Sequence, residues 1–355
     1  MKNILISTGG SGGHVVPATI IFDHLKDEFN IFMTSDIRGV QFLNKGQYNI
    51  EVIDVPKISK NIFLIPFQIL LLFYLIFKSF LLLKKKKIEI LISTGGYMTL
   101  PLCVASKFLN IKLFLLEPNM VLGRTNKLFI RSCVKIFCYS NKIKKFPYNL
   151  KNKISLIPSL LRKDFYVSKK AILLDREIRL LIIGGSQRAK LFDNFVKDSI
   201  INLSKKYKLK IFHQTSLSNY NNLKNFYLKN NIENELFDFN KDISTFMSKS
   251  NICITRAGAS TLAELVFLNL PHIVMPLPSA KDNHQFENAL FYNQIGCNWI
   301  LNQKQTDSSI LTEKLFSIIV NKEEYLEKKK NMKNFNFHNT WNNINQKIIT
   351  IINEN

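Results

Sequence analysis

The stretch NILISTGGSGGH, residues 3–14, decides the fold. Residues 3–7 are apolar and predict a buried strand, and the glycines that follow form a turn that opens a helix. A glycine turn between a strand and a helix is typical of Rossmann-like units. Three further turns of this kind follow, so that each half of the chain holds two: residues 93–97 (STGGY), 184–187 (GGSQ) and 256–261 (RAGAST).

Short β-rich runs alternate with helical patterns along all 355 residues. Apolar strands separated by helices predict parallel sheets covered on both faces. We therefore expect an α/β protein with two Rossmann-like domains whose sheets face a central cleft, divided in the polar stretch 158–176. The runs expected to form strands are 3–7, 30–34, 50–55, 88–93, 111–117, 134–140 and 154–157 in the first half, and 178–183, 209–214, 235–239, 252–255, 272–276 and 298–301 in the second.

Composition narrows the classes of function. Lys and Arg number 49 and Asp and Glu 26, a net charge of +23 that favours anionic partners such as membranes or phosphate-bearing substrates. Because Lys, Asn, Ile and Phe are enriched together, as in A/T-rich coding sequences, we do not expect nucleic-acid binding. The five cysteines include no C-x-x-C pair, which argues against structural zinc and a disulfide framework and favours a reducing cytosol.

Residues 62–83 form the most conspicuous apolar stretch, charged only at Lys78 and followed by lysines at 84–87. Its length would suit a membrane span, but the strand-like runs on its two sides would then lie on opposite sides of the bilayer. Two alternatives remain open. The stretch is either a core-facing crossover helix or a crossover helix with an exposed apolar face that docks on an anionic membrane.

The glycine turns match no known nucleotide-binding fingerprint, but they predict that the site binds an anion. Val15 stands where a dinucleotide-binding turn needs its third small residue, and no P-loop sequence occurs. Glycines still let backbone N–H groups approach an anion at a helix N-terminus. Two side chains beside such turns are candidates for chemistry: His14 as a proton acceptor and Glu264 as the partner of a ribose diol.

Seven segments, in this order and spacing, resemble one family along essentially the whole chain. It is the family of membrane-associated transferases that add N-acetylglucosamine (GlcNAc) from UDP-GlcNAc to lipid I, making lipid II for peptidoglycan. The segments are GGSGGHVVPA (9–18), GGYMTLP (95–101), EPNMVLGRTNK (117–127), GGSQ (184–187), TRAGASTLAE (255–264), LPHIVMPLP (270–278) and KDNHQFENA (281–289).

The resemblance implies the two-domain GT-B fold. Residues 1–160 would bind acceptor and membrane, residues 161–335 would bind UDP-GlcNAc, and a final helix, 336–355, would return to the first domain. It also implies an inverting transfer to the 4-hydroxyl of N-acetylmuramic acid (MurNAc), with His14 as the base and a water-linked Glu117 as the alternative. The residues that the resemblance places at the substrates are Ser11, Gly12, Gly13, Asn119, Arg162, Ser186, Asn240, Ala259, Ser260, Thr261, Leu262, Ala263, Glu264 and Gln285.

No D-x-D motif is present, so we expect neither a metal nor a tightly bound cofactor, and helix N-termini would hold the diphosphate. The expected partners are UDP-GlcNAc, lipid I, an anionic membrane and cell-wall synthesis proteins, at the cytoplasmic face of the inner membrane. Arg188 and the segment 158–161 (PSLL) depart from the family pattern. The alternative function is that of another GT-B enzyme, such as a glycolipid synthase or a UDP-GlcNAc epimerase.

Overall fold

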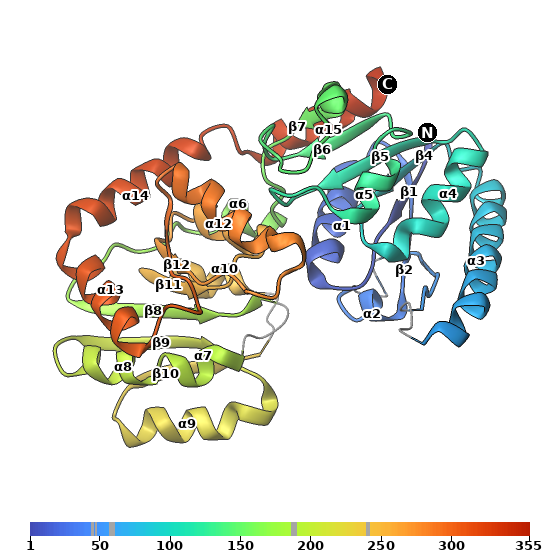
Figure 1. Cartoon of the computed structure of the whole chain (residues 1–355). Helices are drawn as coiled ribbons and strands as arrows, with labels where there is room; N and C mark the ends of the chain where they lie inside the picture. Colours follow the sequence, from blue (N-terminus) through green and yellow to red (C-terminus); the bar gives the residue numbers. More distant parts are fainter. Residues whose placement is uncertain (44–45, 47, 57–60, 186–189, 239–241) are drawn as a thin grey trace. The chain divides into compact units, whose positions relative to one another are not determined.

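The computed structural model describes residues 1–43, 46, 48–56, 61–185, 190–238 and 242–355 (Figure 1). It divides the chain into two units. Unit 1 consists of Met1–Leu160 together with Trp341–Asn355, and unit 2 consists of Leu161–Thr340. The chain therefore leaves unit 1 and returns to it at its end.

Unit 1 is built on a seven-stranded parallel sheet in the order β3-β2-β1-β4-β5-β6-β7. The interior strand β1 carries Ile4, Leu5 and Ile6, which are almost completely buried because helices cover both faces of the sheet. The direction of winding reverses between β1 and β4. The strands are β1 Asn3–Ser7, β2 Asn30–Ser35, β3 Ile50–Val52, β4 Ile90–Ser93, β5 Lys112–Glu117, β6 Lys135–Cys138 and β7 Ile154–Leu156.

The last helix of the chain completes unit 1. Ile344, Ile348 and Ile352 are fully buried, and Trp341 stacks on His24 of the first helix with ring centroids 3.7 Å apart. Burial lowers the pKa of His24 to about 4. The helices of unit 1 are α1 Gly12–Leu25, α2 Ile37–Val40, α3 Ile65–Lys85, α4 Leu100–Phe108, α5 Arg124–Phe129 and α15 Trp341–Glu354.

Unit 2 is built on a six-stranded parallel sheet in the order β10-β9-β8-β11-β12-β13. The winding reverses between β8 and β11. The strands are β8 Glu177–Ile183, β9 Lys208–Gln214, β10 Glu233–Phe237, β11 Ile252–Thr255, β12 His272–Val274 and β13 Asn298–Ile300. The helices are α6 Lys163–Val167, α7 Lys190–Phe195, α8 Lys197–Ser204, α9 Tyr220–Lys229, α10 Ile243–Ser248, α11 Ala259–Phe267, α12 His284–Gln294, α13 Ser308–Val320 and α14 Lys322–Phe335.

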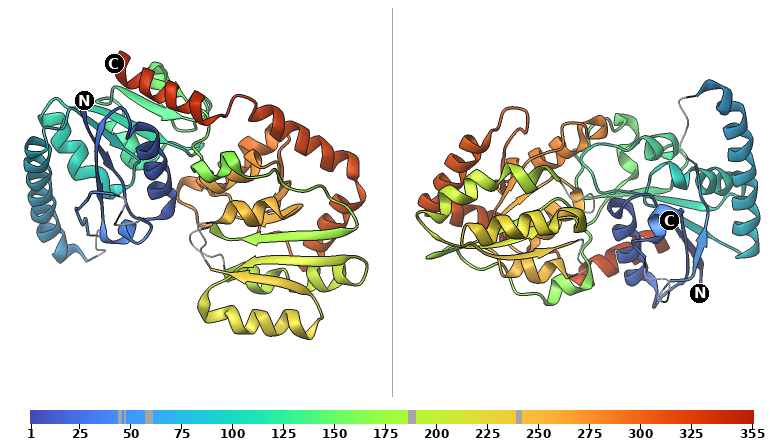
Figure 2. Two further views of the ribbon diagram at one scale, coloured as in Figure 1. Left: turned by 180° about the vertical axis from the view of Figure 1, so that it is seen from behind. Right: turned by 90° about the horizontal axis from the view of Figure 1, so that it is seen from below.

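Helix α3 corresponds to the long apolar stretch, and it is long and apolar enough to cross a membrane by length and composition. Only Leu75, Ser79 and Leu83 of this helix are buried, so it faces the core along one side only and exposes its other apolar side chains. The reason is that α3 packs on α4 and stands on the outside of unit 1 (Figure 2), where only one side of it can reach other residues. Strands β3 and β4, which flank it in sequence, lie in one sheet, as a crossover helix requires.

Candidate functional site

The glycine turns of unit 1 lie at its topological switch point. In an open parallel sheet, ligands bind beyond the carboxyl ends of the strands where the winding reverses. The turns at residues 8–11 and 94–96 follow β1 and β4, the two neighbouring strands between which the order reverses. Sequence reasoning found both turns, and the strand order brings them side by side.

Met98 packs against both turns, and the backbone of each turn favours glycine. Gly10 and Gly96 have positive φ angles of 79° and 83°, and a Cβ atom at either position would lie 2.5 Å or less from the Met98 side chain. The helix that follows, α1, begins at Gly12 with Ser11 as its N-cap, and no side chain caps it. The predicted residues Ser11, Gly12 and Gly13 thus form an uncapped helix N-terminus at the switch point.

His14 lies in the first turn of α1, and its neighbours set its tautomer. Its Nδ1 atom lies 2.8 Å from the carbonyl oxygen of Thr94. A carbonyl only accepts, so Nδ1 carries the hydrogen and Nε2 of the neutral ring is a proton acceptor. A Cβ atom on Gly96 would lie 3.4 Å from Nε2, which shows that this nitrogen points toward the second turn.

Glu117 ends β5, is 2% exposed and fixes the loop that follows it. Its carboxylate accepts hydrogen bonds from the backbone and side chain of Asn119, from the Gly123 N–H at 2.7 Å and from the Asn126 amide at 3.0 Å. Burial raises its pKa, and these hydrogen bonds oppose that rise. The predicted site residue Asn119 therefore has its amide nitrogen directed at Glu117, 3.1 Å away.

The glycine turns of unit 2 repeat this arrangement. They follow β8 and β11, between which that sheet reverses its order. Helix α11 begins with Gly258 as its N-cap and has no side-chain cap, while Ser260 and Thr261 are half-buried. A Cβ atom on Gly185 would lie 3.7 Å from Thr261 Oγ1, so this hydroxyl faces the other turn.

The remaining residues predicted at this end of α11 fall into three groups. Ala259 is half-buried at the first helical position. Leu262 and Ala263 pack into the core, so only their backbone could meet a ligand. Ser186, Arg188 and Asn240 lie outside the described residues.

Glu264 and Arg162 form an ion pair. Among the predicted site residues that the structure describes, no other two are paired in this way. Glu264 is 8% exposed, and Arg162 Nη2 lies 3.8 Å from its Oε1. Burial raises the pKa of Glu264 to about 7, the charge of Arg162 lowers it and the charge of Asp164 raises it. The pair places a carboxyl group that titrates near neutral pH beside the start of α11.

Gln285 has its side-chain oxygen engaged by backbone. This oxygen accepts the N–H groups of Leu277 at 2.9 Å and Ala257 at 3.3 Å, which leaves the amide nitrogen to donate to a ligand. Gln285 therefore joins the turn before α11 to the loop after β12.

Sequence reasoning missed the side chains that hold the turns in place. Arg256 is 8% exposed, and its Nη1 donates to the carbonyl of Met275 at 2.9 Å. In unit 1, Asp36 directly follows β2 and bonds to Gly10. Their signal in the sequence is a charged residue at the carboxyl end of an apolar run, the edge where ligands bind parallel sheets.

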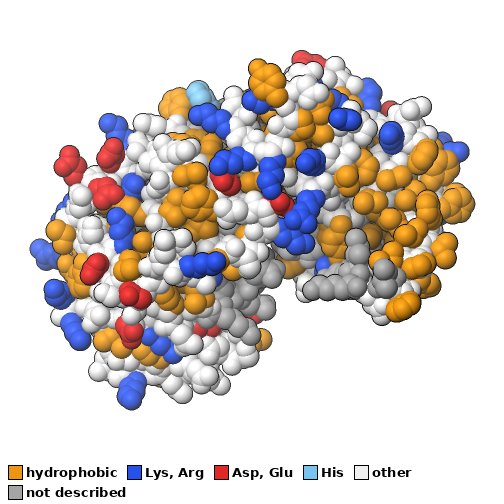
Figure 3. Space-filling model, in the orientation of Figure 1, with side chains coloured by type: hydrophobic (Ala, Val, Ile, Leu, Met, Phe, Trp, Pro, Cys, Tyr) orange, Lys and Arg blue, Asp and Glu red, His pale blue; other side chains and the backbone are white. Residues whose placement is uncertain are grey.

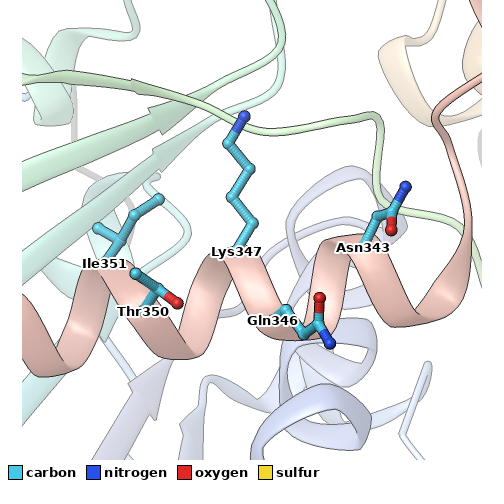
Figure 4. Close-up of a pocket in the computed structure, with 5 residues that line it drawn as sticks. All are labelled: Asn343, Gln346, Lys347, Thr350 and Ile351. Carbon is cyan, nitrogen blue, oxygen red and sulfur yellow. The ribbon is translucent and has the colours of Figure 1, made fainter.

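A surface depression of about 420 Å³ runs beside α15 (Figure 4). It contains none of the residues predicted from the sequence. Its lining comes from one helix and includes no acid: Asn343, Gln346, Lys347, Thr350 and Ile351.

Comparison with known proteins identifies the family. Residues 4–138 match the glycosyltransferase family 28 N-terminal domain, and residues 179–344 match the C-terminal domain of that family. A transferase of Pelagibacter ubique (strain HTCC1062) is 61% identical over 354 residues, which cover 100% of this chain and 99% of that protein. Its name is UDP-N-acetylglucosamine–N-acetylmuramyl-(pentapeptide) pyrophosphoryl-undecaprenol N-acetylglucosamine transferase.

The chain belongs to glycosyltransferase family 28. The transferase of the same name from Rickettsia bellii is 33% identical, over 90% of this chain and 92% of that protein. Among solved structures, Acinetobacter baumannii MurG has a TM-score of 0.78 at 23% identity with both chains covered completely. The Neisseria meningitidis UDP-GlcNAc 2-epimerase has a TM-score of 0.65 at 14% identity. These two likenesses confirm the GT-B fold of this family 28 glycosyltransferase.

Proposed function

We propose that this family 28 glycosyltransferase moves GlcNAc from UDP-GlcNAc to the 4-hydroxyl of MurNAc in lipid I and so forms lipid II. The observation that carries the proposal is the full-length relationship, at 61% identity, to a transferase named for this reaction. The alternative, another GT-B enzyme such as an epimerase, has less support, because the epimerase likeness is one of fold at 14% identity.

In this proposal unit 2 binds the donor. The uncapped start of α11, with Ser260 and Thr261, and the turn at Gly184–Gly185 supply N–H groups and a helix dipole for the diphosphate. Negative charge grows on this diphosphate as UDP departs, so the same groups stabilise the transition state. No metal or cofactor is part of the proposal.

Two side chains of unit 2 then select the rest of the donor. The Glu264 carboxylate would accept hydrogen bonds from the ribose hydroxyls, with Arg162 beside it to favour the ionised form. The Gln285 amide nitrogen would donate to the sugar, and Asn119 of unit 1 would be the second sugar contact. Of the other predicted donor contacts, Ser186 and Asn240 fall outside the described residues.

His14 is the base in this proposal. Inversion requires the acceptor 4-hydroxyl to lose a proton as it attacks the anomeric carbon from the side opposite UDP. The hydrogen bond from Nδ1 to Thr94 O leaves Nε2 as the accepting nitrogen, the form a base needs. Glu117 is less suited, because four hydrogen bonds from its own loop already occupy its oxygens.

Helix α3 is the membrane-docking surface in this proposal. Its outer side exposes large apolar side chains (Figure 3), and lysines follow at its C-terminal end. Apolar side chains that enter the interface and lysines that meet anionic headgroups act together in peripheral binding. The enzyme would thus work at the cytoplasmic face of the inner membrane, where a polyprenyl acceptor is anchored. The exposed side chains are Phe63, Leu64, Ile65, Phe67, Ile69, Leu70, Phe73, Tyr74, Phe77 and Leu81.

The test is UDP release by the purified enzyme, given UDP-GlcNAc with and without a short-chain lipid I analogue. We expect the enzyme to release UDP only when the acceptor is present. The lipid product should then carry the GlcNAc–MurNAc disaccharide. The Glu264→Ala variant should lose this release through weaker donor binding. Release without acceptor, or none with it, would contradict the proposal.

A further inference from the structure

Asp36 is a buried carboxylate that no catalytic step described above uses. It follows β2 directly, is 0% exposed and is the N-cap of the short helix α2. Its Oδ1 accepts the N–H of Gly10 at 2.6 Å and the N–H of Gly39 at 2.9 Å. A buried charge of this kind is tolerated only with full hydrogen bonding, so its partners are held firmly.

The same carboxylate also holds an arginine over the sheet edge. Arg38 donates to Asp36 Oδ2 from Nε at 2.8 Å and from Nη2 at 2.6 Å. Nη2 also donates to the hydroxyl of Tyr97, and the guanidinium carbon lies 5.2 Å from the centre of the Tyr97 ring. Because Tyr97 follows the second glycine turn, Asp36 is connected to both turns of the switch point.

The fit between these segments is tight. A Cβ atom on Gly9 would lie 2.5 Å from Asp36 Oδ1, and a Cβ atom on Gly39 would lie 2.7 Å from Gly9 Cα. The end of β2 is therefore shaped to the turn after β1. Any shift of Asp36 would be transmitted to Gly9 and Gly10, and from there to Ser11 and His14.

We infer that Asp36 is a positioning residue for the acceptor side of the reaction. By taking the Gly10 N–H, it fixes the direction of the following N–H groups and of His14, and through Arg38 and Tyr97 it sets the second turn against the first. The inference rests on the proposed function and adds to it a role for a residue that touches no substrate.

The experiment compares Asp36→Ala with Asp36→Asn in the full-length enzyme, using UDP-GlcNAc and a short-chain lipid I analogue. A misplaced catalytic group can cost roughly 100-fold, so we expect Asp36→Ala to lower kcat/KM for the acceptor by about 10- to 100-fold. The dissociation constant of UDP-GlcNAc should not change, because the hydrogen bonds of Asp36 go to Gly10, Gly39 and Arg38 and to none of the residues proposed to bind the donor. Asp36→Asn should lose less, since its amide oxygen can still accept the Gly10 N–H.

Two further variants make the test specific. Asp54→Asn changes an exposed acid whose Oδ1 lies 3.4 Å from the N–H of Ile37, and it should behave like the wild type. Gly39→Ala keeps the Asp36 carboxylate but places a Cβ atom against Ser35 Oγ, 2.7 Å from Gly9 Cα and 3.1 Å from Asp36 Oδ1, so it disturbs the same contacts from the other side. It should lower acceptor kcat/KM with donor affinity unchanged. Wild-type acceptor kinetics in Asp36→Ala, or a parallel loss of donor affinity, would overturn the inference. Inactive wild-type enzyme would instead contradict the proposed function.

Discussion

At the scale of single residues, His14 shows how a neighbour decides chemistry. The sequence alone does not show which nitrogen of this histidine carries the hydrogen. The carbonyl of Thr94, in the other glycine turn, fixes the tautomer. General bases of this kind contribute about 10²- to 10⁴-fold to rate, so we expect His14→Ala to lower kcat by that amount. The measurement is single-turnover transfer to a lipid I analogue, with UDP-GlcNAc binding measured in parallel. Full turnover in His14→Ala would remove His14 from the base role.

Glu264 gives a prediction of pH dependence. With a pKa of about 7, its carboxyl group is mostly protonated at pH 6 and mostly ionised at pH 8. If the ionised form accepts hydrogen bonds from the ribose, donor affinity rises with pH through this range. We expect the dissociation constant of UDP-GlcNAc to be about tenfold higher at pH 6 than at pH 8. Titration calorimetry at several pH values measures it.

The control for this pH dependence is Glu264→Gln, which has no ionisable group and should bind the donor weakly but equally at both pH values. Two histidines of unit 2 are not expected to contribute, because burial lowers the pKa of His272 to about 4 and also lowers that of His213. The His284→Ala variant tests whether His284, next to Gln285, contributes to the pH dependence of donor binding. A pH dependence that persists in Glu264→Gln would mean that another group is responsible.

At the scale of elements, the proposed role of α3 depends on the apolar side chains that it exposes. Phe73 and Phe77 are 65% and 60% exposed, so changing both to Asp should leave folding intact. Each buried Phe is worth about 1.5–3 kcal/mol, so we expect the double variant to bind anionic vesicles at least about tenfold more weakly. Cosedimentation with phosphatidylglycerol vesicles measures this affinity.

The matched control is Leu326→Asp, because Leu326 is 52% exposed on α14 of unit 2. It introduces one aspartate, against two in the test variant, at an exposed apolar position outside the proposed surface, and it should not change vesicle binding. Raising the salt concentration should weaken binding of the wild type, since the lysines after α3 act electrostatically. Equal binding by the wild type and the Phe73→Asp/Phe77→Asp variant would contradict docking through α3.

At the scale of the whole molecule, the path of the chain predicts how the units fold. Unit 2 is one continuous stretch, Leu161–Thr340, whereas unit 1 needs Trp341–Asn355 from the end of the chain. The three buried isoleucines of α15 contribute about 1.5–3 kcal/mol each, a large share of a typical stability of about 5–15 kcal/mol.

We therefore expect a 161–340 fragment to fold alone and bind UDP-GlcNAc. A 1–160 fragment should fold cooperatively only when a 341–355 peptide is added. Circular dichroism melting curves test both fragments, with a peptide carrying Ile348→Asp as the control. A 1–160 fragment that melts cooperatively without the peptide would contradict this prediction.

Much of the fold could be predicted from the sequence. The thirteen runs expected to be strands are all strands, with ends that differ by up to three residues. They were recognisable because a strand buried on both faces, such as residues 180–183, is a continuous apolar run that a turn follows. The return of the last helix to the first domain came from the family resemblance, and the structure confirms it.

The candidate site was predictable only in part. Glycine turns are visible because backbone with positive φ, as at Gly10 and Gly96, demands glycine at fixed places in the sequence. The sequence places Asp36 and Arg256 at the carboxyl ends of apolar runs, but it does not show which segments they hold, since each acts on a segment distant in sequence. The exposure of α3 was one of two alternatives that the sequence left open, because an apolar pattern does not say how much of a helix its neighbours cover.

The sequence by itself determined which segments are strands and helices, where the glycine turns lie and which family the motifs resemble. The strands, helices and turns depend on neighbours within a few residues, and the resemblance depends on the order and spacing of short motifs along the chain. Tertiary structure alone decided that β1 lies beside β4 and β8 beside β11, which brings the turns together in pairs at the switch points. It also decided that Asp36 holds Gly10 and that Arg162 meets Glu264. Such contacts join residues 26 and about 100 positions apart, and only packing, with water excluded from between the partners, selects them.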